Sequence, residues 1–288
     1  MKRPTLNVVG TGIQAAGQVT IEARSAIESA DRVFFLVTDP LTLEYLERCN
    51  SNLESLHTSY ASGRPRMDSY LEMVGRIIET MERGESVCVA LYGHPGVFAF
   101  PAHEAIRQAR ARGWYARMCP AVSAEDCLFA DLGVDPAWTG CQSFEATDFL
   151  LFNRRWDIRS ALVLWQIGVI GDTSFQGGGY AYKAGLQLLV GRLAEHYGPE
   201  HRVIVYEAAH YPIYPHRADT VSVAELADTA LTPESTLFVP PGASSVPDPA
   251  MLDLLGIADA AIHRVRVQLL GARTTDDLLA HVAPPVGD

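Results

Sequence analysis

The sequence predicts an α/β protein whose N-terminal half forms a largely parallel, doubly wound sheet. Short apolar runs bounded by turn residues alternate there with helical patterns, and a helix between two strands is the usual connection of parallel neighbours. Apolar residues make up 48% of the 288 residues and charged residues 20%, so a packed core is expected. The expected strands are LNVVG (6–10), RVFFLV (32–37), SVCVALY (86–92) and YARMC (115–119), and the expected helices are 19–30, 67–83 and 102–112.

The second half predicts a mixed arrangement of strands and helices, separated by turn-rich segments that contain proline. With a bend at Pro120, we expect a boundary near residues 119–122, an N-terminal domain at 1–120, a C-terminal domain at 121–256 and a less regular tail at 257–288. The elements expected here are a helix opening at SAEDCLFADLG (123–133) with Ser123 as N-cap, strands at 161–168, 202–208 and 235–241, a helix at 184–197, and in the tail an edge strand at 263–271 and a short helix at 275–282.

Charge and composition argue against several classes of protein. The net charge of −11 disfavours a nucleic-acid binder, because phosphate contacts need clustered Lys and Arg. The four arginines of RQARARGWYAR (107–117) are read as a solvated helix face. No apolar run approaches the roughly 20 residues of a membrane span, and the N-terminus lacks the pattern of a signal peptide. Five scattered cysteines without metal-binding spacing indicate reduced thiols in a cytoplasmic protein with no metal site.

A glycine-rich turn follows the first expected strand, in VVGTGIQAAGQVT (8–20). Glycines let backbone amides approach a ligand closely. The spacing is G-T-G-x(4)-G, which is neither the dinucleotide pattern G-x-G-x-x-G nor a P-loop followed by lysine. A tight turn without any ligand explains this segment equally well.

The loop LYGHPGVFAF (91–100) carries more information. In open α/β sheets ligands bind beyond the carboxyl ends of the strands, and this loop follows such an end. Gly93 and Gly96 allow the backbone to be exposed, and Phe98 offers an apolar contact. On position alone, Phe98 is more often a core residue and His94 a turn residue than a ligand contact or a catalyst.

Several segments together resemble the tetrapyrrole-methylase superfamily, and more narrowly the borosin peptide backbone α-N-methyltransferases. Gly93-His94-Pro95 replaces the G-D-P of ordinary tetrapyrrole methylases, as in borosin enzymes, and SAEDCLFADLG is a borosin-like signature. The resemblance runs from about Val8 to Gly256. The segments that carry it are LYGHPGVFAFPAHEAI, CPAVSAEDCLFADLGVDP, QSFEATDFLLFN, LVLWQIGVIG, VIVYEAA and SYASGRPRMDSYLEMV (59–74).

The resemblance implies that Tyr60, Arg66 and Tyr70 carry catalysis, with Tyr92 beside them. A backbone amide is a very weak acid whose nitrogen lone pair is delocalised, so its methylation needs proton removal and a stabilised imidate. A guanidinium favours a nearby phenolate, so Tyr60 with Arg66 is the expected base and Tyr70 the expected donor to the imidate oxygen. Tyr92 is expected near the methyl sulfonium.

Spacing alone favours plainer roles for these residues. Tyr70 lies at the edge of an apolar helical stripe and reads as a core residue, and Tyr60 and Arg66 read as surface loop residues. The spacing leaves open whether Arg64 or Arg66 faces the site. The expected stripe consists of Met67, Leu71, Val74, Ile78 and Met81.

The resemblance also implies the methyl donor, the fold and the partners. It implies two α/β domains with S-adenosylmethionine in a cleft between them, S-adenosylhomocysteine as product, and an interlocked homodimer. The short segment after Gly256 leads us to expect the split bacterial type, in which a separate precursor peptide is methylated iteratively in trans. The alternatives are a methyltransferase of the same superfamily that acts on a tetrapyrrole or other small molecule, and a non-catalytic peptide-binding protein. The expected donor-binding residues are Tyr92, His94, Val97, Phe98, Ser123, Ala124, Gln166 and Ala208.

Overall fold

The computed structural model describes residues 3–172 and 183–258, which divide into two compact units. The first unit holds residues 3–127, to which Asp172 and Ala208–Tyr214 return from later in the chain, and the second holds the other described residues. The division after Cys127 lies a few residues beyond the boundary expected near 119–122. The strand and helix expected at 263–271 and 275–282 lie outside the described residues.

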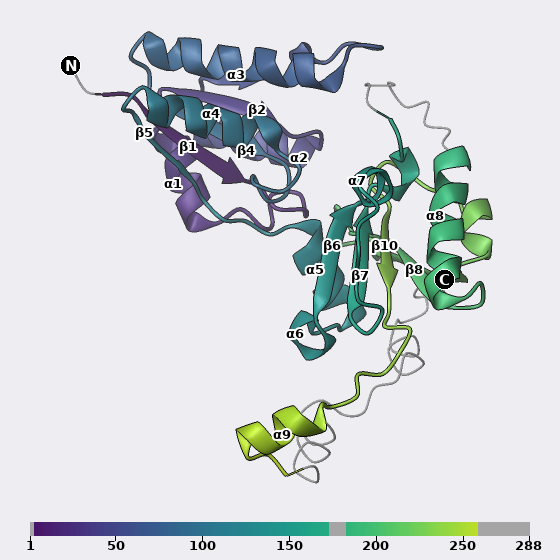
Figure 1. Cartoon of the computed structure of the whole chain (residues 1–288). Helices are drawn as coiled ribbons and strands as arrows, with labels where there is room; N and C mark the ends of the chain where they lie inside the picture. Colours follow the sequence, from purple (N-terminus) through teal and green to yellow (C-terminus); the bar gives the residue numbers. More distant parts are fainter. Residues whose placement is uncertain (1–2, 173–182, 259–288) are drawn as a thin grey trace. The chain divides into compact units, whose positions relative to one another are not determined.

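The first unit is built on a five-stranded sheet with the order β3-β2-β4-β1-β5 (Figure 1). Every pair of neighbours in this sheet is parallel, which confirms the predicted parallel sheet. The short strand β3 was not predicted, because its three residues LES include a charged and a polar side chain. The strands are β1 (Thr5–Gly10), β2 (Arg32–Leu36), β3 (Leu53–Ser55), β4 (Val87–Leu91) and β5 (Tyr115–Met118).

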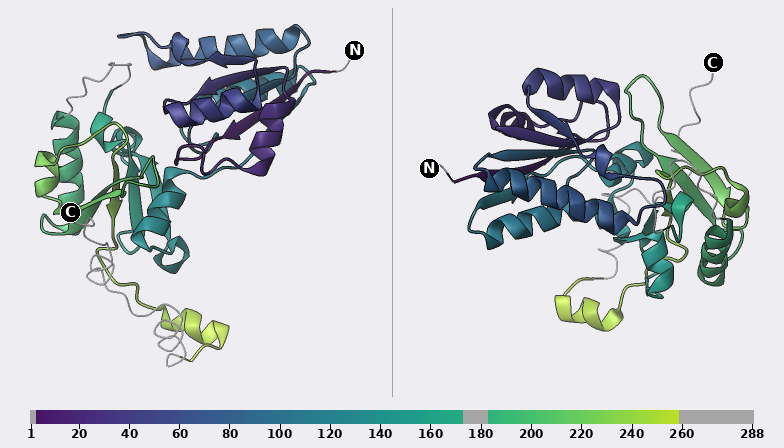
Figure 2. Two further views of the ribbon diagram at one scale, coloured as in Figure 1. Left: turned by 180° about the vertical axis from the view of Figure 1, so that it is seen from behind. Right: turned by 90° about the horizontal axis from the view of Figure 1, so that it is seen from above.

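Helices cover both faces of this sheet, as Figure 2 shows. Side chains alternate between the two faces of a strand, so a strand buried on both sides is apolar throughout. In β4, Val87, Val89 and Leu91 pack with α3 and α4, whereas Cys88 and Ala90 pack with α1 and α2. The helices are α1 (Ile21–Ser29), α2 (Pro40–Cys49), α3 (Arg66–Glu82) and α4 (Phe100–Ala111).

The buried face of α3 differs from the predicted stripe in its first two turns. Met67 and Leu71 are 48% and 50% exposed, so these two positions of the stripe are wrong. Met67 lies in the first turn and Leu71 at the margin of the face that the sheet covers. The buried positions follow a 3.6-residue period: Ser69, Met73, Val74, Ile77, Ile78, Thr80 and Met81.

The second unit contains a mixed five-stranded sheet with the order β6-β7-β10-β8-β9. Only β6 and β7 are parallel neighbours, and the other three pairs are antiparallel, as a mixed half predicts. The edge strands β6 and β9 were not predicted, and both contain polar residues. The strands are β6 (Cys141–Glu145), β7 (Ala161–Trp165), β8 (Arg202–Glu207), β9 (Arg217–Ser222) and β10 (Thr236–Val239).

Leucines at helical spacing hold α8 against the second sheet. Leu186, Leu189 and Leu193 are buried with Leu162 and Leu164 of β7 in one apolar cluster. The α-helices of this half are α5 (Ala124–Leu132), which includes the last residues of the first unit, α6 (Pro136–Thr139), α7 (Ala146–Leu151), α8 (Lys183–Tyr197) and α9 (Pro249–Leu255). Short 3₁₀ helices are η1 (His57–Ser59) in the first unit, and η2 (Ile167–Val169) and η3 (Glu225–Asp228) in the second.

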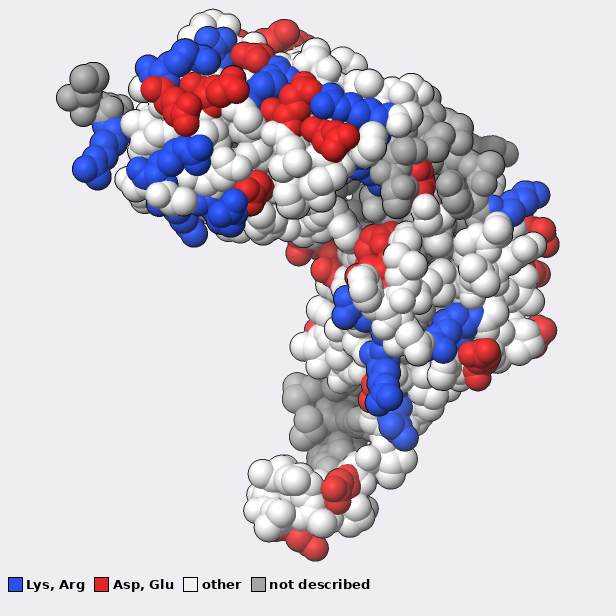
Figure 3. All heavy atoms as spheres, turned by 45° about the horizontal axis from the view of Figure 1, so that its top comes forward, with Lys and Arg blue, Asp and Glu red and all other residues white. Residues whose placement is uncertain are grey.

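The surface carries interspersed charges of both signs, as the face drawn in Figure 3 shows. Each of the four arginines between 107 and 117 is bound by the protein itself: Arg107 pairs with Glu104 and Arg117 with Glu22, for example. This agrees with the solvated helix face predicted for that run. Among residues 3–172 and 183–258 no helix has the length and apolar character of a membrane span.

Candidate active site

Two glycine-containing loops are joined at the carboxyl end of the first sheet. They follow the neighbouring strands β1 and β4, and the Gly93 amide donates to the Gly12 carbonyl at 2.9 Å. A Cβ atom on Gly10 would lie 2.1 Å from the Gly93 carbonyl oxygen and 2.8 Å from Cδ of Pro95. Only glycine permits this approach, so Gly10 is required by packing between the two loops.

The glycine-rich loop after β1 uses its own amides internally. Oε1 of Gln18 accepts from the amide of Ile13 at 2.7 Å and from the amide of Gln14 at 3.1 Å. A phosphate-binding loop needs such amides to point at the ligand. The loop therefore agrees with the tight-turn reading and not with a phosphate cradle.

His94 shapes the loop after β4. Its Nδ1 accepts from the Gly96 amide at 3.0 Å, and the Gly96 carbonyl is 2.9 Å from Nε2 of His103. The structure thus gives His94 the turn role that its position suggested. A contact of His94 with a methyl donor stays a prediction.

The tip of the same loop exposes apolar side chains in a constrained backbone. Val97 and Phe98 are 44% and 52% exposed, so Phe98 is not the core residue that position alone favoured. Phe98 has φ of 50°, a left-handed conformation that is unfavourable for an aromatic residue. Such residues concentrate at functional sites. Gln166, another predicted donor contact, has φ of 58° at the end of β7 in the second unit.

Tyr60 and Tyr70 meet at the edge of the first sheet. Tyr60 ends η1, just after β3, and Tyr70 lies in the second turn of α3. Their ring centroids are 6.4 Å apart in an edge-to-face arrangement, and the two side chains share a hydrogen bond. Tyr70 also stacks on Phe100 at 6.1 Å, at the start of α4. Both tyrosines are half-buried against the α3–α4 core, as spacing predicted for Tyr70, whereas the surface position that spacing favoured for Tyr60 is wrong. Their catalytic roles stay predictions.

Arg66 joins this pair from the first position of α3. It is four residues before Tyr70, so both side chains lie on one face of the helix. A cation at a helix N-terminus is unfavourable, because the helix dipole is positive there. Nη2 of Arg66 lies 3.5 Å from Oδ2 of Asp172, whose side chain is only 2% exposed.

Arg64 takes a different direction. Its Nη1 pairs with Glu72 at 2.6 Å and donates to the Ser59 carbonyl at 3.2 Å. Of the two arginines, Arg66 is the one with an electrostatic effect on Tyr60. The geometry therefore favours Arg66 as the partner of Tyr60.

The pKa of Tyr60 is raised above its usual value, whereas the nearby Arg66 was expected to lower it. Burial of the phenol is the largest cause, and the neighbouring Tyr70 adds to it, whereas the Arg66 guanidinium lowers the pKa by less. Since the folded pKa exceeds the value of about 10 in an unfolded chain, the fold favours the neutral phenol. This contribution to stability is present below about pH 10 and is lost as the pH rises through the folded pKa.

Tyr92 has an aromatic partner that sequence reasoning missed. The ring of His210 stacks on Tyr92 at 5.6 Å, and its Nε2 is 3.4 Å from the Tyr92 hydroxyl. The His210 carbonyl accepts from the Ala15 amide at 2.8 Å, which joins the segment after β8 to the glycine-rich loop. His210 lies only two residues after Ala208, a predicted donor contact, and this proximity in sequence could have pointed to it. Nothing in the local pattern marked Asp172.

The start of α5 is capped by its own side chains. The Ser123 amide donates to Oδ2 of Asp126 at 2.7 Å, and Oγ of Ser123 accepts from the Asp126 amide at 3.2 Å. This confirms Ser123 as N-cap, and it leaves the Ser123 amide occupied by Asp126. Ser123 and Ala124 as donor contacts stay predictions, as does Ala208, which is half-buried in the first unit.

Comparison with known protein families places the chain among the methylases. The chain belongs to the family of tetrapyrrole (corrin/porphyrin) methylases, whose model matches residues 5–212. No group of three or more His, Cys, Asp or Glu residues able to hold a metal occurs in the described part of the chain.

Curated relatives match nearly the whole chain. A methyltransferase/gymnopeptides precursor from Gymnopus fusipes is 38% identical over 97% of this chain and 64% of its own length. A methyltransferase/omphalotin A precursor from Omphalotus olearius is 38% identical over 98% of this chain and 66% of its own. A methyltransferase/type III borosin precursor from Anomoporia bombycina is 44% identical over 83% of this chain and 28% of its own length. The chain thus spans two thirds or less of these relatives.

Solved structures share the fold at low identity. Uroporphyrin-III-C-methyltransferase from Thermus thermophilus has a TM-score of 0.61 at 19% identity, over 90% of this chain and all of that one. Diphthine synthase has a TM-score of 0.58 at 15% identity, over 90% of this chain and 99% of that one. These similarities support the tetrapyrrole-methylase fold predicted from sequence.

The close approach at Gly10 makes a prediction about stability. Gly10→Ala should lower the free energy of unfolding by about 2 kcal/mol or more, because its Cβ would overlap backbone that cannot move aside. Gly75→Ala in α3 is the matched control: its Cβ would meet nothing within 4 Å, so the free energy should rise by about 0.5–1 kcal/mol. Urea denaturation of both variants measures this, and equal stability of the two would contradict it.

Proposed function

We propose that this protein transfers methyl groups from S-adenosylmethionine to backbone amide nitrogens of a peptide. The observation that carries the proposal is the arrangement of Tyr60, Arg66 and Tyr70 beside one edge of the sheet, where the two phenols share a hydrogen bond and the Arg66 charge acts on Tyr60. The names of the relatives, which join a methyltransferase to a cyclic-peptide precursor, support it.

Each residue of the trio has a role that amide chemistry requires. The amide nitrogen becomes nucleophilic only when its proton leaves, and Tyr60 as phenolate takes that proton. Arg66 favours the phenolate, and Tyr70 donates a hydrogen bond to the oxygen on which the imidate charge develops. S-adenosylmethionine supplies an electrophilic methyl group, so the nitrogen–carbon bond forms as the carbon–sulfur bond breaks and S-adenosylhomocysteine leaves.

The residues of the loop after β4 fit such a donor. S-adenosylmethionine has no phosphate, and in the neighbouring loop after β1 two amides that a phosphate would need are held by Gln18. The loop after β4 exposes Val97 and Phe98, which suit the apolar and aromatic parts of the donor. Tyr92, held by His210, would orient the methyl group.

The source of the peptide and the oligomeric state complete the proposal. The expectation of a separate precursor of the bacterial split type finds no support in the relatives, because their names join methyltransferase and precursor in one protein. A peptide supplied in trans and the homodimer that the resemblance implies are therefore parts of the proposal to be tested directly.

The deciding experiment offers two substrates separately. The protein is incubated with S-adenosylmethionine and either a synthetic precursor segment of the Omphalotus olearius relative or uroporphyrinogen III. Mass steps of one methylene, localised to backbone nitrogens by fragmentation, support the proposal and the arrangement in trans. Methylation of uroporphyrinogen III alone would favour a small-molecule methyltransferase. Absence of donor binding by calorimetry would favour a non-catalytic binding protein.

Comparison of the two arginines tests the assigned partner of Tyr60. Arg66→Ala should reduce kcat by about a hundredfold or more, because the phenolate loses its counter-charge. Arg64→Ala should retain at least about a tenth of the activity, since its guanidinium pairs with Glu72 on the surface. Donor affinity, measured by calorimetry, should stay within threefold in both. A larger loss in Arg64→Ala would reverse the assignment.

The raised pKa of Tyr60 predicts an alkaline rate profile. At pH 7 only a small fraction of Tyr60 is ionised, so log kcat should rise with a slope of about one between pH 7 and 9. Between pH 7 and 9 Tyr60 stays mostly neutral, so its contribution to the stability of the fold is retained over this range. Tyr60→Phe should be nearly inactive and show no such slope. A plateau of the wild-type rate below pH 8 would show that Tyr60 is not the base.

A further inference from the structure

We propose that Arg76 of α3 is a positioning residue that fixes Tyr60 against Tyr70. The inference rests on the proposed function, because it concerns the geometry of the proposed base. Arg76 acts through the segment 54–59, which immediately precedes Tyr60.

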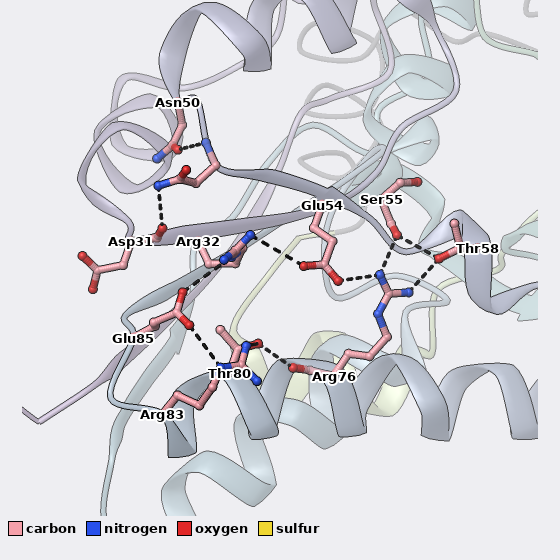
Figure 4. Close-up of polar contacts among 11 residues, drawn as sticks. Asp31, Arg32, Asn50, Glu54, Ser55, Thr58, Arg76, Thr80, Arg83 and Glu85 are labelled. Atoms are coloured by element: carbon pink, nitrogen blue, oxygen red, sulfur yellow. Dashed lines mark hydrogen bonds and ion pairs between the residues drawn. The ribbon is translucent and has the colours of Figure 1, made fainter.

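Four hydrogen bonds tie Arg76 to that segment. Nη2 donates to Oε1 of Glu54 and to the Ser55 carbonyl, both at 2.8 Å. Nη1 donates to Oγ1 of Thr58 at 2.9 Å and to Oγ of Ser59 at 3.0 Å. Figure 4 shows Glu54, Ser55 and Thr58 gathered around the guanidinium. One side chain thus binds a carboxylate, a carbonyl and two hydroxyls.

The segment has other contacts besides Arg76: the Leu56 amide donates to the Phe35 carbonyl at 3.0 Å, Nε2 of His57 lies 3.1 Å from the Val37 carbonyl, and Arg64 donates to the Ser59 carbonyl at 3.2 Å. It consists of the end of β3, an edge strand of three residues, and the three-residue helix η1. A 3₁₀ helix this short has weak internal hydrogen bonding. Leu56 is its apolar anchor in the α3–α4 core. Arg76 is the side chain that joins both ends of the segment, Glu54 and Ser59, to α3, so we infer that it constrains the residue that follows, Tyr60.

The helix α3 connects the Arg76 contacts to the other residues of the candidate site. Arg66 and Tyr70 lie in its first two turns, and Arg76 lies six residues beyond Tyr70 on the same rigid element. The distance from Tyr60 to Tyr70 is thereby set through one helix. A guanidinium suits this task because its donors are held in one plane, whereas an ammonium presents a single point of charge. Arg76 also lies over the Phe34 ring at 5.8 Å, which fixes its plane.

The same polar network offers a matched control at its far end. Glu54 also pairs with Arg32 at 3.8 Å, and Arg32 with Glu85 at 3.5 Å. Arg83, at the C-terminal end of α3, binds Glu85 at 3.3 Å and Thr80 at 2.8 Å. Arg83 makes no recorded contact with residues 54–59, so its removal alters the network without loosening the segment before Tyr60.

The first measurement does not depend on enzymatic activity. It tests whether the hydrogen bonds of Arg76 restrain residues 54–59, an arrangement that we call the Arg76 clamp. Amide hydrogen exchange is followed by mass spectrometry in the wild type, Arg76→Gln and Arg83→Gln. In Arg76→Gln, peptides covering 54–60 should exchange at least about tenfold faster, with the rest of the first sheet unchanged. In Arg83→Gln the same peptides should match the wild type. Equal exchange in all three proteins would overturn the proposed clamp.

The second measurement tests the link to Tyr60 in the peptide methylation assay. Arg76→Gln should lose at least about tenfold in kcat, with KM for the peptide and donor affinity within threefold, because misplacement of a base affects the chemical step. Arg76→Lys should be nearly as impaired, and Arg83→Gln should stay within twofold. If Arg76→Lys has the kcat of the wild type, a positive charge alone is sufficient, and the proposed role of the planar guanidinium is overturned.

A milder variant guards against a general loss of folding. Thr58→Val removes one acceptor of Arg76 at nearly constant volume and should reduce kcat by about threefold, in the same direction. Faster exchange at 54–60 with unchanged kcat would confine Arg76 to stability and overturn its positioning role. If the wild type itself does not methylate the peptide, the proposed function fails, while the exchange result still decides whether the clamp exists.

Discussion

The structure of the first unit depends on the close backbone contact between the loops that follow β1 and β4. Parallel neighbouring strands deliver their carboxyl ends to one edge of the sheet, and the missing side chain of Gly10 lets the Gly93 carbonyl approach there. The backbone hydrogen bond from Gly93 to Gly12 then holds the two loops in register. The exposure of Val97 and Phe98 is consistent with this contact, because a loop fixed at its base presents its tip to solvent.

The helix α3 organises the second part of the candidate site. Its first residue, Arg66, lies where the helix dipole disfavours a cation, and the buried carboxylate of Asp172 offsets that unfavourable position. Natural sequences tend to break local rules at functional positions, and a cation at this helix start fits the role that we propose for Arg66. Further along the same helix, Arg76 holds the segment before Tyr60 by four hydrogen bonds. One element therefore controls three of the groups that the chemistry would need.

Sequence patterns predicted the core strands well and the long-range contacts poorly. The runs that became β1, β2 and β4 are largely apolar on both faces, and this signal is strong because parallel sheets are buried on both sides. The strand β3 was missed because LES carries no such signal. His210 and Asp172 were missed because they reach the site from distant parts of the chain, and spacing contains no information about such contacts. Gln18 was missed for a different reason: a side chain that satisfies loop amides resembles any other polar loop residue.

The sign of the Tyr60 pKa shift shows why a nearby cation alone does not make a base. Burial raises the pKa more than Arg66 lowers it, so the resting residue is a neutral phenol. A phenol with a higher pKa gives a stronger base, but proton-transfer rates grow less than tenfold per pKa unit while the ionised fraction falls tenfold. Burial without compensation therefore slows the reaction. Arg66 has to limit this loss, and its pairing with Asp172 reduces the field that it exerts on Tyr60. In the proposed reaction the rate of proton removal would therefore depend on how the Arg66 charge is divided between Asp172 and the phenolate, and the positioning of Tyr60 that we propose for Arg76 would influence that division.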